Sequence, residues 1–279
     1  RAAWLDRRRK GLGSSDIGAI FGLSPWAGPW QVWISKIHGI DDAGNKATIT
    51  GQLLEEAVGK WAASRLKADG LMVAPEHVHP TRSWMRANGD YLLRFGDRHD
   101  GLECKVSTYP DESKGWGPDM SSQVPAAYES QVRWCMAVMD RPRWWLACAF
   151  LNAREWRIYR IERDADIERD MVERAEAWWI RHVVGREPPD TDGSLACARA
   201  LAQAHNRAKG ELRVADKAEE DAVRLYAKLD ARIKHYEGHR AQLKNHLRQT
   251  IGDDEGIRFT GGFAKWHRPS NRLTVKIRD

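Results

Sequence analysis

The spacing of apolar residues divides the first two thirds of the chain into helices and strands. Helical spacing and cap residues predict helices over 13–22, 29–39, 50–67, 125–140 and 164–185. The expected N-cap of the first helix is Ser14 or Ser15. Short apolar runs bounded by turn residues predict strands over 71–79, 84–93, 102–108, 143–152 and 155–163, with a turn at 96–101. This order predicts an α/β fold in which helices flank a mixed central sheet.

The last third of the chain has a different pattern. The segment 186–194, REPPDTDGS, predicts a linker, so we expect a domain over 1–190 and a separate helical region over 191–279. In the helix that follows, apolar residues recur at alternating steps of three and four, which predicts packing against another helix of this chain or of a partner. These residues are Tyr226, Leu229, Ile233, Tyr236, Leu243 and Leu247, with Arg240 at the missing position. Three short strands after it predict a small sheet.

Composition narrows the class of protein. The net charge of +6 and the pI near 9.2 are compatible with a polyanionic partner, although the basic residues of the C-terminal helix fit a solvated face better. The four cysteines form no CxxC pair, which predicts buried, reduced thiols of an intracellular protein. No apolar run is long enough to span a membrane, and the N-terminal segment does not resemble a signal peptide. We therefore expect a cytoplasmic protein without a membrane partner.

One group of residues has the chemistry of a metal site. Asp90 lies on one predicted strand and Glu103-Cys104-Lys105 on the next. Residues two apart on a strand share a face, so Glu103 and Lys105 point the same way and Cys104 points to the other side. Two carboxylates suit a hard divalent cation such as Mg²⁺, to which the backbone carbonyl of Cys104 adds a further ligand. These residue types are also common on surfaces, so the spacing alone does not establish a site.

Five segments resemble, in order, the YqaJ-like viral recombinases, a family that includes the phage lambda-type exonuclease and belongs to the PD-(D/E)xK nuclease superfamily. The resemblance covers roughly residues 5–185. The segments are RRRKGLGSSDIGAIFGLSPW, TGQLLEEAVGKWA, ANGDYLL, LECKVST and PAAYESQVRWCMAVMD. It implies a PD-(D/E)xK core with a helical C-terminal extension that ends in a small hairpin or sheet.

The resemblance also implies roles for single residues. Asp90 and Glu103 correspond to the metal-binding carboxylates, and Lys105 corresponds to the catalytic lysine. Gln131 matches a glutamine on the helix that lines the site, and Glu55 matches an acidic residue of the helix before the sheet. Glu56 is an alternative to Glu55, although one helical step rotates it away. Asp97 and Asp100 also precede the Glu-x-Lys strand, but the stretch 97–101 predicts a turn.

The first of the five segments resembles the region with which the lambda-type enzyme binds the 5′-phosphate of a DNA end. Arg8 and Ser15 fall at those positions, near a predicted helix N-terminus, where free N–H groups favour an anion. The neighbouring alternatives are Arg7, Arg9, Lys10 and Ser14. Trp26 and Trp30, in a proline-containing segment, are candidates for stacking on a base.

The resemblance implies a Mg²⁺-dependent, 5′→3′ double-strand DNA exonuclease of phage or prophage recombination, with Mn²⁺ as a substitute cation. Its partners would be double-stranded DNA ends, a single-strand annealing protein and further copies of itself in a trimeric ring, in the cytoplasm of a bacterial host. The alternatives are an endonuclease or single-strand nuclease of the same fold, and an inactive DNA-binding recombination scaffold. The intact Asp90, Glu103 and Lys105 set argues against the scaffold.

Overall fold

The structure is a computed structural model that describes residues 7–39, 46–205, 210 and 212–277. The chain forms two compact units, Arg1–Arg207 and Ala208–Asp279, which we call unit 1 and unit 2. The predicted boundary at 190–191 falls inside unit 1. Helix α7 (Leu195–Ala204) belongs to this unit because its Ala200 packs against α3 (Pro29–His38). Whether 191–279 acts as a separate functional domain stays a prediction.

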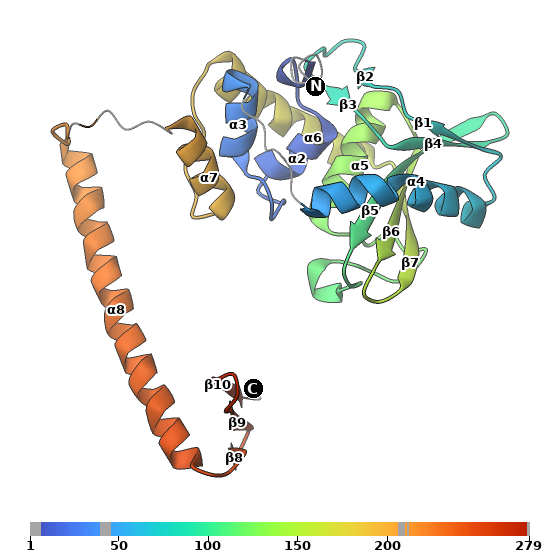
Figure 1. Ribbon diagram of the computed structural model, residues 1–279. Coiled ribbons are helices and arrows are strands. Elements are labelled where there is room, and N and C mark those ends of the chain that lie inside the picture. The colour runs from blue at the N-terminus through green and yellow to red at the C-terminus, as the bar shows by residue number, and fades with distance from the viewer. Residues whose placement is uncertain (1–6, 40–45, 206–209, 211, 278–279) are drawn as a thin grey trace. The chain divides into compact units, whose positions relative to one another are not determined.

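A five-stranded sheet in the order β1-β4-β5-β6-β7 forms the centre of unit 1 (Figure 1). Strands β5 and β6 are parallel and all other neighbours are antiparallel, which confirms the predicted mixed sheet. The strands are β1 (Gly70–Val73), β4 (Tyr91–Phe95), β5 (Arg98–Ser107), β6 (Arg143–Phe150) and β7 (Glu155–Glu162).

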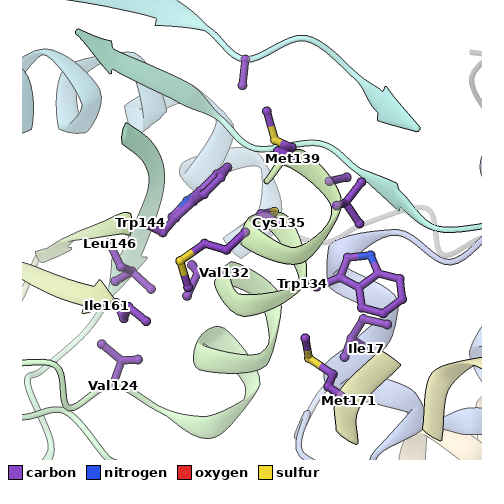
Figure 2. Packing of buried hydrophobic residues seen from close by; sticks show 14 of the residues in the cluster. Ile17, Val124, Val132, Trp134, Cys135, Met139, Trp144, Leu146, Ile161 and Met171 are labelled. Carbon is purple, nitrogen blue, oxygen red and sulfur yellow. The ribbon is translucent and has the colours of Figure 1, made fainter. Parts of the chain in front are cut away.

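Helices cover both faces of this sheet, and alternate residues of β6 pack into the two layers. Trp144, Leu146 and Cys148 belong to the buried cluster around α5 (Ala126–Met139). Trp145 and Ala147 belong to the cluster under α4 (Lys46–Leu66). Figure 2 shows residues of the α5 layer, where that helix packs between the sheet and residues of the other helices. The remaining helical elements of unit 1 are α2 (Ser14–Ile20), η1 (Glu112–Lys114), α6 (Ala165–Trp178) and the π-helical turn η2 (Trp179–Val184).

Two predicted strands are each divided in the structure. The segment 71–79 forms β1 and then β2 (His77–Val78), and the segment 84–93 forms β3 (Arg86–Ala87) and then β4. Strands β2 and β3 pair with each other in a separate two-stranded sheet. Both divisions fall where the sequence has punctuating residues, Pro75 in the first segment and Gly89 in the second.

The predicted turn at 96–101 is wrong for its second half, because β5 already begins at Arg98. A further correction concerns the predicted cap of α2. Gly13 is the N-cap, and the Asp16 carboxylate accepts a hydrogen bond from its N–H at 2.8 Å, so neither Ser14 nor Ser15 caps this helix. The start of α3 at Pro29 and its end before Gly39, where φ is 66°, follow the prediction.

Unit 2 consists of a long helix and a small sheet. Helix α8 (Lys217–Ile251) has 35 residues and leaves the predicted heptad residues largely exposed. The three-stranded antiparallel sheet has the order β10-β9-β8, with β8 (Gly256–Phe259), β9 (Gly262–His267) and β10 (Arg272–Ile277). This confirms the predicted small sheet.

The state of the cysteines follows the prediction of buried thiols. All four cysteines are free and buried. In the part of the chain that the structure describes, no helix has the length and the apolar character needed to cross a bilayer.

Candidate active site

Strand β5 presents the Glu-x-Lys pattern between the two helix layers. Cys104 packs in the cluster under α4, as the alternation predicts. Glu103 and Lys105 face the other side, where Lys105 Nζ lies 2.5 Å from Glu103 Oε1. The amide of Gln131 on α5 donates a hydrogen bond to the same Oε1 at 2.5 Å. Glu103 is 2% exposed, so its carboxylate is buried and held by an ammonium group and an amide.

Asp90 reaches this group from the segment just before β4. It is not part of a strand, contrary to the prediction. Its Oδ2 accepts a hydrogen bond of 2.7 Å from the backbone N–H of Cys104, which fixes the carboxylate beside β5. The preceding Gly89 lies against the ring of Trp144, and a Cβ there would be 2.5 Å from Trp144 Cζ2. A larger residue would therefore displace the segment that carries Asp90.

The chemistry of the site fits a hard divalent cation. Glu103 Oε2 is a buried oxygen without a hydrogen-bond partner in the structure. A cation would satisfy this oxygen and would balance the negative charges of Glu103 and Asp90. Among the described residues no three His, Cys, Asp or Glu side chains gather into a ready-made metal cluster. The protein would thus supply two carboxylates, as Mg²⁺ sites that retain water commonly do.

Burial sets the ionisation of this group. Burial of Glu103 and the negative charge of Asp90 raise its pKa to about 7, against the lowering effect of Lys105. Burial also raises the pKa of Asp90. Burial disfavours the charged form of Lys105, but the two carboxylates raise its pKa above the usual value. Lys105 therefore stays an ammonium at neutral pH beside the two carboxylates.

The raised pKa of Glu103 predicts how stability depends on pH in the absence of divalent cations. The folded protein holds the proton of Glu103 more tightly than the unfolded chain between pH 4.5 and about 7. The stabilisation is fully present below pH 4.5 and is lost as the pH rises through about 7. In EDTA we expect the free energy of unfolding of the wild type, relative to Glu103→Gln, to fall by up to about 3 kcal/mol over this window. Urea unfolding of both proteins from pH 4.5 to 8 checks this, and parallel pH profiles would contradict it.

The structure distinguishes between the candidate acidic residues of the sequence. Glu55 on α4 is half-buried, and its pKa is raised first by burial and then by the negative charge of Asp90. Glu55 therefore lies close enough to Asp90 to interact with it electrostatically. Glu56 is exposed and pairs with Lys60 at 2.6 Å. Asp97 lies in the turn before β5.

Asp100 has a different role from the one its predicted turn implied. It lies within β5, is fully buried, and accepts a hydrogen bond of 3.0 Å from the indole of Trp145. Arg98 lies 3.0 Å from its Oδ1, and Arg143 lies 3.6 Å from its Oδ2. Asp100 therefore joins β5 to β6 through the ion pair with Arg143 and the hydrogen bond from Trp145. These contacts occupy its carboxylate, so Asp90 remains the predicted metal ligand.

A cavity of about 390 Å³ lies next to Gln131. Arg8 and Ser15 line this cavity, so the structure brings the two predicted phosphate-binding residues together with the helix residue that contacts Glu103. Arg7 and Ser14 also line it and remain alternatives. The Arg9 side chain instead donates hydrogen bonds to the carbonyls of residues 36 and 37 at the end of α3.

A buried ion pair that no sequence pattern indicated positions Arg8. Asp16 and Lys36 are both 3% exposed, and Lys36 Nζ lies 2.6 Å from Asp16 Oδ2. Arg8 Nη2 lies 3.0 Å from the other oxygen, and Lys36 also donates to the Arg8 carbonyl at 2.9 Å. Burial opposes ionisation of Asp16, but Lys36 and Arg8 lower its pKa below the usual value. An apolar-spaced helix with one lysine gives no sequence signal for this.

An aromatic stack lies beside the lysine. Lys105 Nζ is 5.2 Å from the ring centroid of Tyr128, and the exposed ring of Trp26 stacks on Tyr128 at 5.6 Å. Tyr128 was also missed as a site residue, although it lies three residues before Gln131 on the same helix. Trp30 is partly buried and packs edge-on against Trp33 between α3 and α7, whereas Trp26 is 61% exposed and is the more accessible candidate for base stacking.

Comparison with known proteins identifies the fold and the family of the chain. The fold is similar to that of an alkaline exonuclease from Laribacter hongkongensis, with a TM-score of 0.51 and 15% identity over 75% of this chain and 100% of that chain. The model of the YqaJ-like viral recombinase domain matches residues 3–142, and the chain belongs to this family. It is also similar to the "Uncharacterized protein YqaJ" of Bacillus subtilis (strain 168), with 28% identity over 295 residues that cover all of this chain and 88% of that protein.

Proposed function

We propose that the chain is a Mg²⁺-dependent deoxyribonuclease that digests double-stranded DNA from its 5′ ends. Family and fold support a nuclease of the lambda-exonuclease type. The observation that carries the end-specific part is the position of Gln131, which contacts Glu103 and also lines the cavity with Arg8 and Ser15. A terminal phosphate in that cavity would set the first phosphodiester beside the carboxylates.

Each side chain of the site would have a separate role in hydrolysis. Asp90 and Glu103 would hold the cation, together with the Cys104 carbonyl, and Glu55 would assist through water. Bound Mg²⁺ supplies Lewis-acid stabilisation of the phosphate oxygens and of the leaving 3′-oxygen. Lys105 remains protonated, so it would orient the attacking water and offset the charge that develops on the phosphate. Gln131 fixes the Glu103 carboxylate for this task.

The wider setting is part of the same proposal. The cation is Mg²⁺, with Mn²⁺ as a substitute, because two carboxylates and water suit either ion. The substrates are duplex ends in the cytoplasm of a bacterial host, in phage or prophage recombination. A single-strand annealing protein would take the product, and the chain would form a trimeric ring.

We expect the enzyme to degrade linear duplex DNA with 5′-phosphates and to leave closed circular duplex intact. Arg8→Gln should lower the rate on 5′-phosphorylated ends by about 10- to 100-fold, since a hydrogen bond to a charged group is worth 1.5–3 kcal/mol. The same substitution should have little effect on ends that carry a 5′-hydroxyl. Release of acid-soluble nucleotides measures the rates on the two kinds of linear end. Conversion of closed circles to nicked or linear DNA on an agarose gel measures cleavage of the circle.

Arg9→Gln is the matched control, because Arg9 contacts the end of α3 and does not line the cavity. It should keep the preference for 5′-phosphate. Equal cleavage of circular and linear DNA would replace the exonuclease with an endonuclease. Faster digestion of single strands would assign single-strand specificity, and no cleavage with either cation would leave only a DNA-binding scaffold.

A further inference from the structure

The small sheet of unit 2 has two chemically different faces. Its middle strand β9 alternates, and Ala264 on one face is 2% exposed. On this inner face β10 contributes Leu273 and Val275, which line a cavity together with Leu243 and Leu247 of α8. The other face of the sheet is turned away from these residues.

This outer face is basic. The register of the three strands places the alternate residues of β8, β9 and β10 side by side on it. They include Arg258, Phe263, Lys265, His267, Arg272 and Lys276. The remaining two positions are Gly256 and Thr274, so the outer face has no acidic residue among its described positions.

The charge is concentrated in this unit. Residues 208–279 contain 16 Lys and Arg against 11 Asp and Glu, so five of the six net positive charges of the chain fall here. On the N-terminal half of α8, Lys217 pairs with Asp221 and Arg224 pairs with Glu220 within the helix. On the outer sheet face only Lys265 has an ion-pair partner among the described residues, Glu255, which is 84% exposed.

An aromatic residue lies at the centre of the cations. Phe263 is half-buried on the middle strand, with Arg258 directly opposite on β8 and Lys276 directly opposite on β10. Neighbouring strands are about 4.8 Å apart, so a cation lies on each side of the ring at that spacing. Surfaces that bind single strands combine an aromatic platform for a base with cations for the adjacent phosphates.

We propose that the outer face of the β8–β10 sheet binds single-stranded DNA, with a base stacked on Phe263 and the backbone held by Arg258 and Lys276. A 5′→3′ digestion of duplex leaves such a strand, so the sheet would hold a product of the proposed reaction. The binding itself does not depend on the nuclease site, because every residue that carries it belongs to unit 2.

The test measures binding by the full chain in EDTA, which prevents cleavage. The probe is fluorescein-labelled oligothymidine of about 20 nucleotides, which is longer than the roughly 4–16 nucleotides that one OB-fold covers when it binds single-stranded DNA. The double variant Arg258→Gln/Lys276→Gln should weaken binding about tenfold. The slope of log K against log salt concentration should become less steep by about 1.4, since each phosphate contact on a single strand contributes about 0.7. Phe263→Leu, which keeps an apolar residue on the sheet, should weaken binding about fivefold without changing the slope.

Lys217→Gln/Arg224→Gln removes two charges of the same unit from paired positions and should change the affinity less than twofold. Circular dichroism of each variant verifies that the fold is retained. The proposal fails if the sheet variant binds like this control. It also fails if the sheet variant loses affinity for duplex and single strand equally while Phe263→Leu has no effect, because the face would then bind only phosphates of either form. If the wild-type protein bound oligothymidine but showed no nuclease activity with Mg²⁺ or Mn²⁺, the proposed function would be rejected and the binding proposal would stand.

Discussion

Lys105→Met should lower the rate of DNA hydrolysis by on the order of a thousandfold, the usual cost of removing one group that stabilises the transition state. The reason is the charge that Lys105 keeps, since Glu103 and Asp90 raise its pKa. Methionine fills a similar volume and removes only the ammonium group. The rate constant at saturating DNA and saturating Mg²⁺ is the quantity to measure.

Saturating metal is essential because Lys105 has a second effect. Its ammonium group lowers the pKa of Glu103, so its removal favours the protonated acid and weakens cation binding. If this second effect explained everything, more Mg²⁺ would restore the rate. We expect the loss to persist, because Lys105 is also the group that orients water.

Lys60→Met is the matched control for this substitution. Lys60 is an exposed lysine of α4 whose partner is Glu56, one residue from Glu55. Its removal should leave the rate within a factor of two. Should Lys105→Met retain a tenth or more of the wild-type rate, the assignment of Lys105 as the catalytic lysine would be wrong.

The alternation of β5 was predictable because it depends only on local geometry. A strand places residues two apart on one face, and the structure indeed separates Cys104 from Glu103 and Lys105. The mixed sheet also followed from the order of the elements. The proximity of Gln131 and Glu55 required the family resemblance, since nothing in their spacing from Glu103 indicates contact.

The sequence predictions were wrong or incomplete where a polar residue is buried against partners that are distant in the chain. The stretch 96–101 has the composition of a turn, but Asp100 is buried because Arg143 and Trp145 of β6 satisfy it. Polar composition therefore indicated solvent where the structure has a buried ion pair. Lys36 is a similar case, because its helix has an ordinary amphipathic pattern and its partner Asp16 lies on a different helix.

Asp16→Asn should destabilise the protein by about 3–5 kcal/mol, the typical cost of leaving one charge of a buried pair uncompensated. The side chain of Lys36 is 1% exposed, and the substitution removes its ion pair with Asp16 inside the protein. The double variant Asp16→Asn/Lys36→Met removes both charges and should recover part of the loss. Urea unfolding of the wild type, both single variants and the double variant gives this coupling.

The same cycle separates stability from positioning. Asp16 also holds the Arg8 guanidinium at 3.0 Å, and the double variant loses that contact even where the fold recovers. We therefore expect the double variant to regain stability but not the full preference for 5′-phosphorylated ends, because Arg8 would lose the carboxylate contact that orients its guanidinium beside the cavity. If the double variant instead recovered the full preference, the buried pair would serve folding alone. Additive losses of stability would show that Asp16 and Lys36 are not coupled.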